Sequence, residues 1–304
     1  MRGFSYIHVD KSVMNVSVII PTYNRAKDLA ELLDSLLEQT TKPFEVIIID
    51  DNTPNNTIKV VCHEYKPRFE SVGSKLVYVR NPRERSLTIS RNVGVKIAKE
   101  DVIMFFDDDM ILYPNYIEKI LEAFEKYPNA LGVQGWFQPR KVSHYRFFER
   151  LEKIFSYFFY LGHPAKNRCS LFPPSYPIIL TKIINCDSLC GGCMAFKREV
   201  FNEFKFDERL KKIAYMEDDL FSYSIFKKYP KGLFITPYAK CIHKRSATGR
   251  TEDKELERLE FQYRKYVSVK LLGLKGALIH YWQSIGITIM RLALKLMKRV
   301  VKKK

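Results

Sequence analysis

The predicted fold of this chain is centred on one stretch, Val102-Ile103-Met104-Phe105-Phe106-Asp107-Asp108-Asp109-Met110-Ile111-Leu112. Its five consecutive apolar residues predict a strand that is buried on both faces, as in a parallel sheet. The three carboxylates that follow fall at the carboxyl end of the strand, where open α/β sheets bind ligands. Three adjacent negative charges repel one another, so the cluster favours a hard divalent cation. A solvated acidic turn is the alternative that this stretch alone leaves open.

Strands and helices are predicted to alternate around that stretch. Apolar runs at 16–20, 45–49 and 76–79 indicate three further strands, and leucines between 29 and 37 recur at helical spacing. This alternation predicts a parallel sheet with right-handed crossovers. The run at 45–49 also ends in carboxylates, Asp50 and Asp51. Because the carboxyl ends of parallel strands share one edge of a sheet, we expect the functional site at that edge.

Charge is distributed unevenly along the chain. Its 304 residues carry a formal net charge of +17, yet no acidic residue follows Glu260. Basic residues concentrated in a tail argue against a core built to bind nucleic acid. Six cysteines in a chain of this length do not indicate a disulfide scaffold, and no N-terminal signal peptide is visible. A reducing, cytoplasmic setting is therefore expected.

Six segments, taken together and in order, carry a resemblance to a known family. They are VSVIIPTYNR (16–25), EVIIIDDNTPNNT (45–57), SRNVGVKIA (90–98), VIMFFDDDMIL (102–112), GGCMAFKREVF (191–201) and FDERLKKIAYMEDDL (206–220). The set resembles the inverting nucleotide-sugar glycosyltransferases of family 2. That resemblance implies a GT-A-type α/β fold, with a mostly parallel sheet flanked by helices. It also implies a Rossmann-like nucleotide half followed by an acceptor half, whereas the segment 138–185 matches nothing in the family.

The resemblance implies roles for residues in the donor half. Pro21 and Tyr23 match the loop that packs on the nucleotide base, and Asp51 matches the acid that hydrogen-bonds the base. Arg91 matches a position near the donor diphosphate, where a guanidinium pairs with phosphate oxygens. In the Asp-X-Asp motif, Asp107 would hold the ribose or a metal-bound water, and Asp108 is included among the donor-binding residues.

Metal and catalytic roles are implied in the same way. Asp109 would bind Mn²⁺ or Mg²⁺ directly, and His243 matches a further metal ligand in some family members. A purely structural histidine is the alternative at His243. Glu217 and Asp218 match the Glu-Asp motif, in which the Asp is the general base that takes the proton of an acceptor hydroxyl. Such a base typically contributes ~10²–10⁴-fold in rate.

The expected function is metal-dependent transfer of a sugar from a nucleoside-diphosphate sugar to an acceptor hydroxyl. The bound cation would act as a Lewis acid on the departing nucleoside diphosphate. One alternative is a glycoside hydrolase that uses two carboxylates, such as Asp109 and Asp218. Another is a membrane-surface binding module with a degenerate nucleotide-sugar site. Product analysis distinguishes them, because only a transferase releases nucleoside diphosphate while adding sugar to an acceptor.

The C-terminal region predicts a long amphipathic helix over 267–301. Its longest run without Lys or Arg, 276–290, is shorter than the ~20 residues that span a bilayer. An apolar face with Trp282 and a Lys/Arg stripe suits a helix lying in an anionic membrane interface. Packing on the catalytic domain or in a homodimer seam is the alternative. The polar stripe is formed by His280, Ser284, Thr288, Arg291, Lys295, Lys298 and Lys302.

These patterns divide the chain into two regions. A GT-A glycosyltransferase domain is expected over 1–245, with the nucleotide-sugar half at about 14–110 and the acceptor half at 111–245. A basic amphipathic helical region follows at 246–304. The expected partners are the sugar donor, a glycan or lipid-linked acceptor and an anionic membrane surface, without nucleic acid. The enzyme is therefore expected at the periphery of the cytoplasmic membrane.

Overall fold

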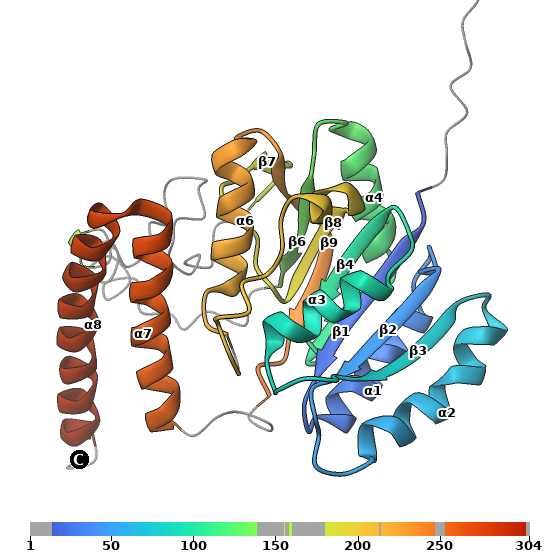
Figure 1. The fold of residues 1–304 in the computed structure, drawn as a ribbon, viewed down its shortest axis with the longest axis horizontal. Helices are drawn as coiled ribbons and strands as arrows, with labels where there is room; N and C mark the ends of the chain where they lie inside the picture. The colour runs from blue at the N-terminus through green and yellow to red at the C-terminus, as the bar shows by residue number, and fades with distance from the viewer. Residues whose placement is uncertain are drawn as a thin grey trace, which may run out of the picture.

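The computed structural model describes residues 14–138, 155, 158–159, 180–212, 214–246 and 253–301. A mixed nine-stranded sheet forms its centre (Figure 1). The strand order is β3-β2-β1-β4-β8-β6-β9-β5, and β7 pairs with β9.

The first half of the sheet is parallel, as predicted. It contains β1 (Val16–Thr22), β2 (Glu45–Asp50), β3 (Lys75–Arg80) and β4 (Val102–Phe106). Every residue of β1, β2 and β4 is buried, which agrees with their continuous apolar sequences. The connecting helices are α1 (Ala26–Leu37), α2 (Thr57–Ser71) and α3 (Leu87–Ile97).

The second half mixes strand directions. β8 (Cys193–Lys197) runs antiparallel to both β4 and β6 (Gly132–Phe137). β9 (Leu233–His243) runs parallel to β6 but antiparallel to β5 (Met110–Leu112) and β7 (Ile184–Asn185). The expectation of a mostly parallel sheet therefore applies to the first half, because the second half inserts β8 between β4 and β6. The helices of this half are α4 (Tyr116–Lys126), the 3₁₀ helix η1 (Arg198–Asn202) and α6 (Glu217–Lys228).

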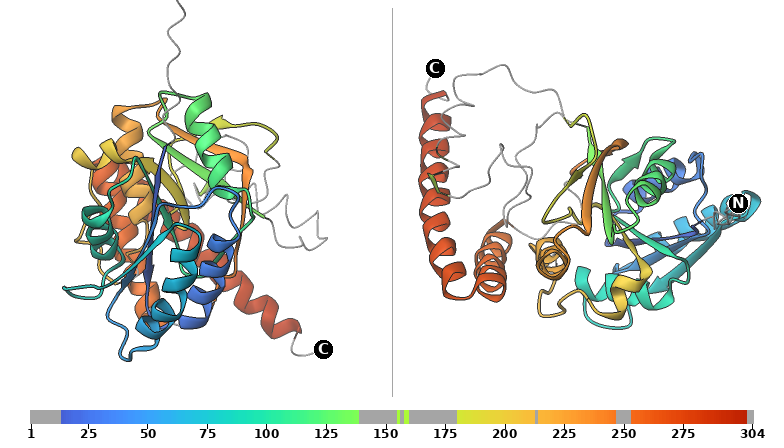
Figure 2. Two further views of the ribbon diagram at one scale, coloured as in Figure 1. Left: turned by 90° about the vertical axis from the view of Figure 1, so that its right-hand side faces the viewer. Right: turned by 90° about the horizontal axis from the view of Figure 1, so that it is seen from above.

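Helices cover both faces of the sheet and enclose two apolar cores (Figure 2). Leucines of α1 pack with residues of α2 and α4 on one face. On the other face, α3, η1 and α6 pack around the Phe105 and Phe206 rings, which meet edge to face at 5.3 Å. Burying each large apolar side chain contributes roughly 1.5–3 kcal/mol. These two cores fix the sheet whose rim carries the acidic residues.

A C-terminal helical hairpin lies beside this body (Figures 1 and 2). It consists of α7 (Asp253–Leu272) and α8 (Leu274–Val301), joined at Gly273 with a φ of 60°. Val267 and Leu271 of α7 join a third apolar cluster with Leu220 of α6, so α7 packs against α6 and α8 lies on the outer side of α7. None of the helices within the described ranges is long and apolar enough to cross a membrane.

The segment 138–185 lies largely outside the described residues. Phe158 and Phe159, which are described, contact α8. The Phe159 ring stacks on Trp282 at 5.1 Å, and the Trp282 indole N–H donates to the Phe158 carbonyl at 2.8 Å. Phe158 and Phe159 therefore pack against the C-terminal hairpin.

Candidate active site

The carboxyl ends of β1, β2 and β4 meet at one rim of the sheet. Thr22 pairs with Asp50 in the β1–β2 register, and Asp107 directly follows β4. A cavity of about 210 Å³ opens at this rim. Among its lining residues are five of those expected to bind the donor. The full lining is Pro21, Thr22, Tyr23, Arg25, Asp51, Arg85, Leu87, Asp107, Asp108 and Lys212.

Asp51 is held rigidly at the base of this cavity. Its Oδ1 accepts hydrogen bonds from the Asn81 side-chain amide at 2.7 Å, the Ser90 hydroxyl at 2.9 Å and the Ser86 backbone N–H at 3.0 Å. The structure gives its Oδ2 no partner among the described residues, so that oxygen has capacity for a ligand donor. The neighbouring Asp50 instead accepts from Thr53 N–H and Tyr78 OH, and so orders the strand end.

Tyr23 forms a flat wall of the same cavity. The Arg85 guanidinium lies 3.5 Å from the centroid of the Tyr23 ring, within range for a cation–π contact. Sequence reasoning missed Arg85, although it stands in the polar loop before α3. An aromatic ring and a planar cation stacked in this way form a surface that suits a planar nucleotide base.

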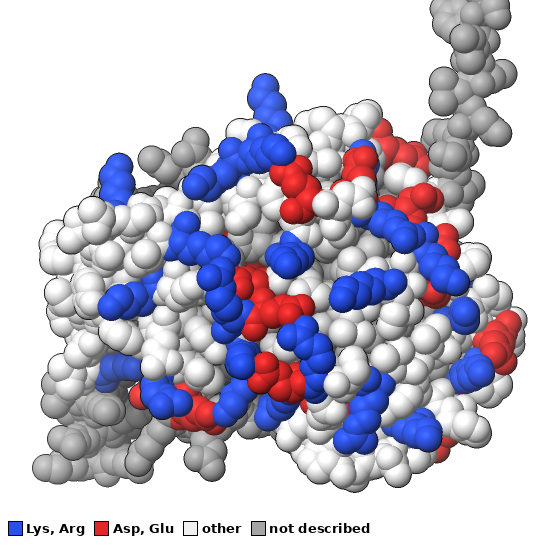
Figure 3. Space-filling model, in the orientation of Figure 1, with Lys and Arg blue, Asp and Glu red and all other residues white. Residues whose placement is uncertain are grey.

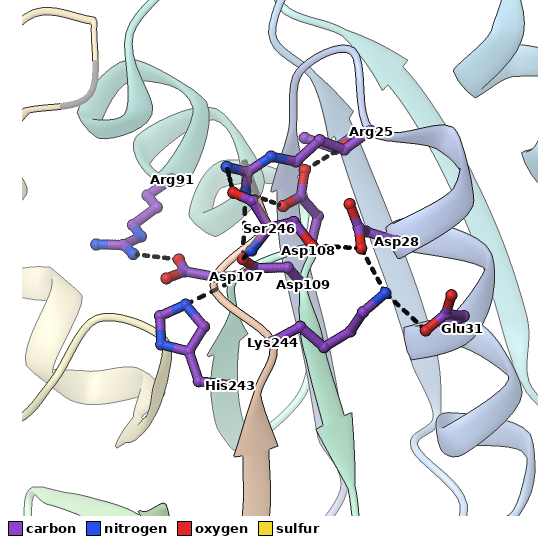
Figure 4. Close-up of polar contacts among 11 residues, drawn as sticks. Arg25, Asp28, Glu31, Arg91, Asp107, Asp108, Asp109, His243, Lys244 and Ser246 are labelled. Atoms are coloured by element: carbon purple, nitrogen blue, oxygen red, sulfur yellow. Dashed lines mark hydrogen bonds and ion pairs between the residues drawn. The ribbon is translucent and has the colours of Figure 1, made fainter. Parts of the chain in front are cut away.

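Asp107, Asp109 and His243 form a candidate metal site beside this cavity (Figure 4). Each offers a ligand atom, and these atoms lie within 4.8 Å of one another. The β5–β9 register explains the grouping, because Met110 pairs with His243 and so brings the imidazole next to Asp109. Two carboxylates and one imidazole are a suitable donor set for Mn²⁺, and carboxylates also suit Mg²⁺.

The electrostatics of this cluster also fit a cation. Asp109 Oδ1 is buried and makes no hydrogen bond among the described residues, although His243 Nε2 lies 3.2 Å away. Burial lowers the pKa of His243, but the adjacent Asp109 and Asp107 outweigh burial and raise it overall. The two carboxylates thus present negative charge to the imidazole, and a bound cation would interact favourably with the same charge.

Arg91 connects this cluster to the start of α6. Its side chain is only 1% exposed, and its guanidinium pairs with Glu217 and lies 3.4 Å from Asp107. Arg91 Nη2 also donates to the Gly191 carbonyl at 3.1 Å, and the Gly191 N–H donates to Asp218 Oδ2 at 2.7 Å. A Cβ atom at residue 191 would lie 2.8 Å from Arg91 Nη2, so this close approach requires glycine. Among the described residues, the Arg91 guanidinium therefore contacts two carboxylates and one backbone carbonyl.

Glu217 and Asp218 begin α6 but occupy different environments. Burial, with the charge of Asp218, raises the pKa of Glu217 to about 8. Burial also raises the pKa of Asp218, against the hydrogen bonds donated by the Gly191 and Asp219 N–H groups. Asp218 is half-buried, whereas Glu217 is buried. Asp218 is therefore the acid of this pair that retains access to solvent.

Comparison with known proteins identifies the family. The family model described as "Glycosyl transferase family 2" matches residues 17–205, more than half of the chain. The chain belongs to glycosyltransferase family 2. Among its relatives, an uncharacterized glycosyltransferase of Haemophilus influenzae is 37% identical over 114 residues, which are 38% of this chain and 36% of the relative. A glucosyl-dolichyl phosphate glucuronosyltransferase of Haloferax volcanii is 29% identical over 132 residues, covering 43% of this chain and 40% of the relative.

Solved structures agree with this family assignment at the level of fold. A mannosyltransferase from Pyrobaculum calidifontis, in complex with GDP-Man and Mn²⁺, superposes with a TM-score of 0.61 at 16% sequence identity. The match covers 93% of this chain and 75% of that one. The predicted family and the predicted GT-A-type α/β fold with C-terminal helices are thus confirmed. The chain spans about two fifths or less of the length of the two curated relatives.

Several residues at this family 2 site escaped the sequence reasoning. Arg25 ends the segment VSVIIPTYNR, and its guanidinium donates to Asp108 at 2.8 Å (Figure 4). Asp108 also accepts from the Thr22 hydroxyl at 2.8 Å, so this expected donor-binding residue orders the β1 loop. Ser246 N–H donates to Asp109 Oδ2 at 2.9 Å. No sequence pattern indicates Ser246, because its approach depends on how β9 pairs with β5.

Proposed function

We propose that this family 2 chain transfers a sugar from a nucleoside-diphosphate sugar to an acceptor hydroxyl, with inversion and with Mn²⁺ or Mg²⁺ bound. One observation carries the proposal. The buried Arg91 guanidinium contacts both Asp107, at the donor cavity, and Glu217, beside Asp218. This link supports the proposal that the acids after β4 and at the start of α6 act together, as a single displacement between donor and acceptor requires.

The roles of the donor-side residues follow from their contacts. Tyr23 and Pro21 line the wall that would pack on the base, and Asp51 Oδ2 would accept a hydrogen bond from it. Asp109 and His243 would hold the cation, with Asp107 adjacent. When bound, a divalent cation offsets the negative charge on the departing diphosphate.

Asp218 is proposed as the general base. It takes the proton from the acceptor hydroxyl while that oxygen bonds to the anomeric carbon. The bond from this carbon to the diphosphate oxygen breaks, and its electron pair leaves with the nucleoside diphosphate. Because burial raises the pKa of Asp218, the carboxylate is a stronger base than a solvent-exposed one. Arg91 and Glu217 are proposed as positioning residues that hold this turn against Gly191.

A lipid-linked or membrane-borne glycan is the proposed acceptor class. The name of the Haloferax relative includes a dolichyl phosphate carrier, which supports this choice. The exposed side of α8 carries apolar residues at helical spacing, including Leu278, Ile285 and Ile289. We propose that this side contacts the cytoplasmic membrane, so that residues 1–245 form the catalytic region and 246–304 a membrane-contacting region.

A ligand screen on the full chain tests the proposed function. UDP-, GDP- and dTDP-sugars are added with Mn²⁺, with Mg²⁺ or with EDTA, and the unfolding temperature is measured. A donor at a hundredfold excess over its Kd stabilises the fold by about 2.7 kcal/mol. We expect one base to give this shift only when a divalent cation is present. Equal shifts with EDTA would argue against metal dependence.

Product analysis with the stabilising donor completes this test. Transfer releases nucleoside diphosphate in proportion to sugar added to a lipid-linked glycan. Free sugar without added acceptor product would instead indicate a hydrolase. Donor binding without turnover would indicate a binding module.

A further inference from the structure

Lys212 is a cation of the donor cavity that the proposed mechanism does not use. It lines this cavity together with Arg25 and Arg85. Arg25 contacts Asp108, and Arg85 stacks on Tyr23. The Lys212 ammonium instead pairs with Glu255, which belongs to α7 and not to the cavity wall. The side chains of Lys212 and Glu255 are 44% and 34% exposed, so solvent and ligand can reach this pair.

The backbone around Lys212 is held in an uncommon conformation. Lys212, Ala214 and Met216 have positive φ values of 57°, 46° and 64°, a region that residues other than glycine rarely adopt. Such conformations persist where surrounding contacts determine them, and they cluster at functional sites. Met216 directly precedes Glu217 and Asp218. The segment 207–216 therefore joins the Lys212 side of the donor cavity to the proposed base.

Contacts from α3 and α7 hold this segment in place. The Leu87 N–H donates to the Lys212 carbonyl at 2.9 Å, which fixes Lys212 at the start of α3. The Lys211 N–H donates to Tyr263 OH at 2.9 Å, and Tyr266 OH donates to Asp207 at 2.6 Å. On the face of the molecule that Figure 3 shows, basic and acidic side chains alternate across the centre. The backbone of residues 211 and 212 is thus hydrogen-bonded to α3 and α7, whereas the Lys212 side chain is exposed and a ligand can reach it.

We propose that Lys212 binds the diphosphate of the donor, and that Glu255 competes for its ammonium when no nucleotide is bound. The inference rests on the proposed function, because it assumes that a nucleoside diphosphate enters this cavity. Breaking the bond to the sugar leaves its electron pair on the diphosphate, which gains a negative charge. An ammonium aimed at that developing charge stabilises the departing group more than the intact donor. Lys212 therefore acts on leaving-group departure and on product affinity.

The ion pair also connects the donor site to the C-terminal hairpin. Glu255 lies in the first turns of α7, and the same helix contacts Asp207 and Lys211. When Lys212 turns to the diphosphate, Glu255 loses this ion pair, and the charges of Arg258 and Arg85 continue to act on it. Donor binding therefore removes one contact between the hairpin and the segment 207–216.

Calorimetric titration of the full chain with UDP, GDP and dTDP in the presence of Mn²⁺ tests this proposal. We expect Lys212→Gln to weaken binding of the preferred nucleoside diphosphate by ~10-fold or more, as loss of a charge-assisted hydrogen bond does. Binding of the intact nucleotide sugar should weaken less, and the kcat of transfer should fall. Lys212→Arg should restore most of the affinity, and Glu255→Gln should tighten binding several-fold.

Lys211→Gln is the matched control. Lys211 is adjacent, similarly exposed and paired with Glu84, but it does not line the cavity. Equal effects of Lys211→Gln and Lys212→Gln would overturn the proposal, and so would weaker nucleotide binding in Glu255→Gln. If the unmodified chain binds none of the three diphosphates, the proposed function itself fails. If it binds one and Lys212→Gln binds it equally well, only the role of Lys212 fails.

Discussion

Two adjacent acids at the start of α6 illustrate how environment separates the roles of similar residues. Glu217 is buried against Arg91, whereas Asp218 is half-buried and accepts hydrogen bonds from two backbone N–H groups. Because the Glu217 carboxylate is buried against the Arg91 guanidinium, it is poorly placed to contact an acceptor hydroxyl. Asp218 is therefore the better candidate for proton transfer, and Glu217 for holding the turn.

Asp218→Asn should lower kcat by ~10²–10⁴-fold, because the variant has no carboxylate to take the acceptor proton. The affinity for nucleoside diphosphate should stay nearly constant, since Asp218 lies outside the donor cavity. Steady-state kinetics and calorimetric titration measure the two quantities separately. Asp219→Asn is the control, because the Asp219 carboxylate accepts a hydrogen bond from the Ser188 hydroxyl at 2.6 Å and is not assigned a role in proton transfer. Equal loss of activity in both variants would contradict the assignment.

The raised pKa of Glu217 predicts how the free energy of unfolding changes with pH. Its pKa in the fold is about 8, above the ~4.3 of an unfolded chain. Between these pH values Glu217 is protonated in the folded chain and ionised in the unfolded chain, so the folded state binds more protons. The contribution of Glu217 to the free energy of unfolding is therefore full below pH ~4.3 and is lost as pH rises through 8. Glu217→Gln should therefore reduce the decline in unfolding free energy between pH 5 and 8. Urea titrations of metal-free protein measure this decline, and parallel curves for the two proteins would refute the prediction.

At the scale of elements, the C-terminal hairpin departs from the pattern of a helix packed in a protein core. His280 and Gln283 are fully buried, whereas Leu274 and Leu278 are 87% and 72% exposed. The expected polar stripe began with His280, but the packing of α8 on α7 buries that histidine. Gly276 allows the close approach, because a Cβ there would lie 1.8 Å from the Ser268 carbonyl oxygen. Within residues 274–292, the exposed side chains of α8 are largely apolar.

The exposed apolar residues of α8 predict that the chain binds to membranes. Leu278→Glu combined with Ile285→Glu should reduce partitioning of the full chain onto anionic vesicles by ~10-fold or more. Each change removes an apolar side chain worth roughly 1.5–3 kcal/mol when buried, and adds a charge that anionic lipids repel. Vesicle sedimentation measures the partitioning. Val60→Glu is the control, because Val60 is an exposed apolar residue of α2.

The competing explanation for the apolar side of α8 is a second copy of the chain. In that case the double variant would have a smaller mass in solution, and its vesicle binding would match that of the unmodified protein. Light scattering on both proteins distinguishes this result. Such an outcome would remove the membrane from the proposed function without affecting the donor site.

At the scale of the whole molecule, the sequence determined the local elements and the positions of the acids along them. Apolar runs of four or five residues identify buried strands because side chains alternate between two covered faces, and the acids at 50–51 and 107–109 follow two of these runs directly. The ordered motifs were also sufficient to predict the family. These features depend on residues that are close in the sequence, so the local sequence pattern is sufficient to predict them.

Only the tertiary structure decided which distant residues share the site. The β5–β9 register brings His243 to Asp109, and a buried hydrogen bond joins Arg91 to Glu217, 126 positions away. The pairing of Lys212 with Glu255 similarly depends on how α7 packs against the segment before α6. The periodicity of apolar residues along the sequence does not predict such contacts, because strand order, register and helix packing depend on how the side chains of the whole core pack together. The sequence therefore predicted the acids of the site together with Arg91 and His243, and the fold decided which of these residues contact one another.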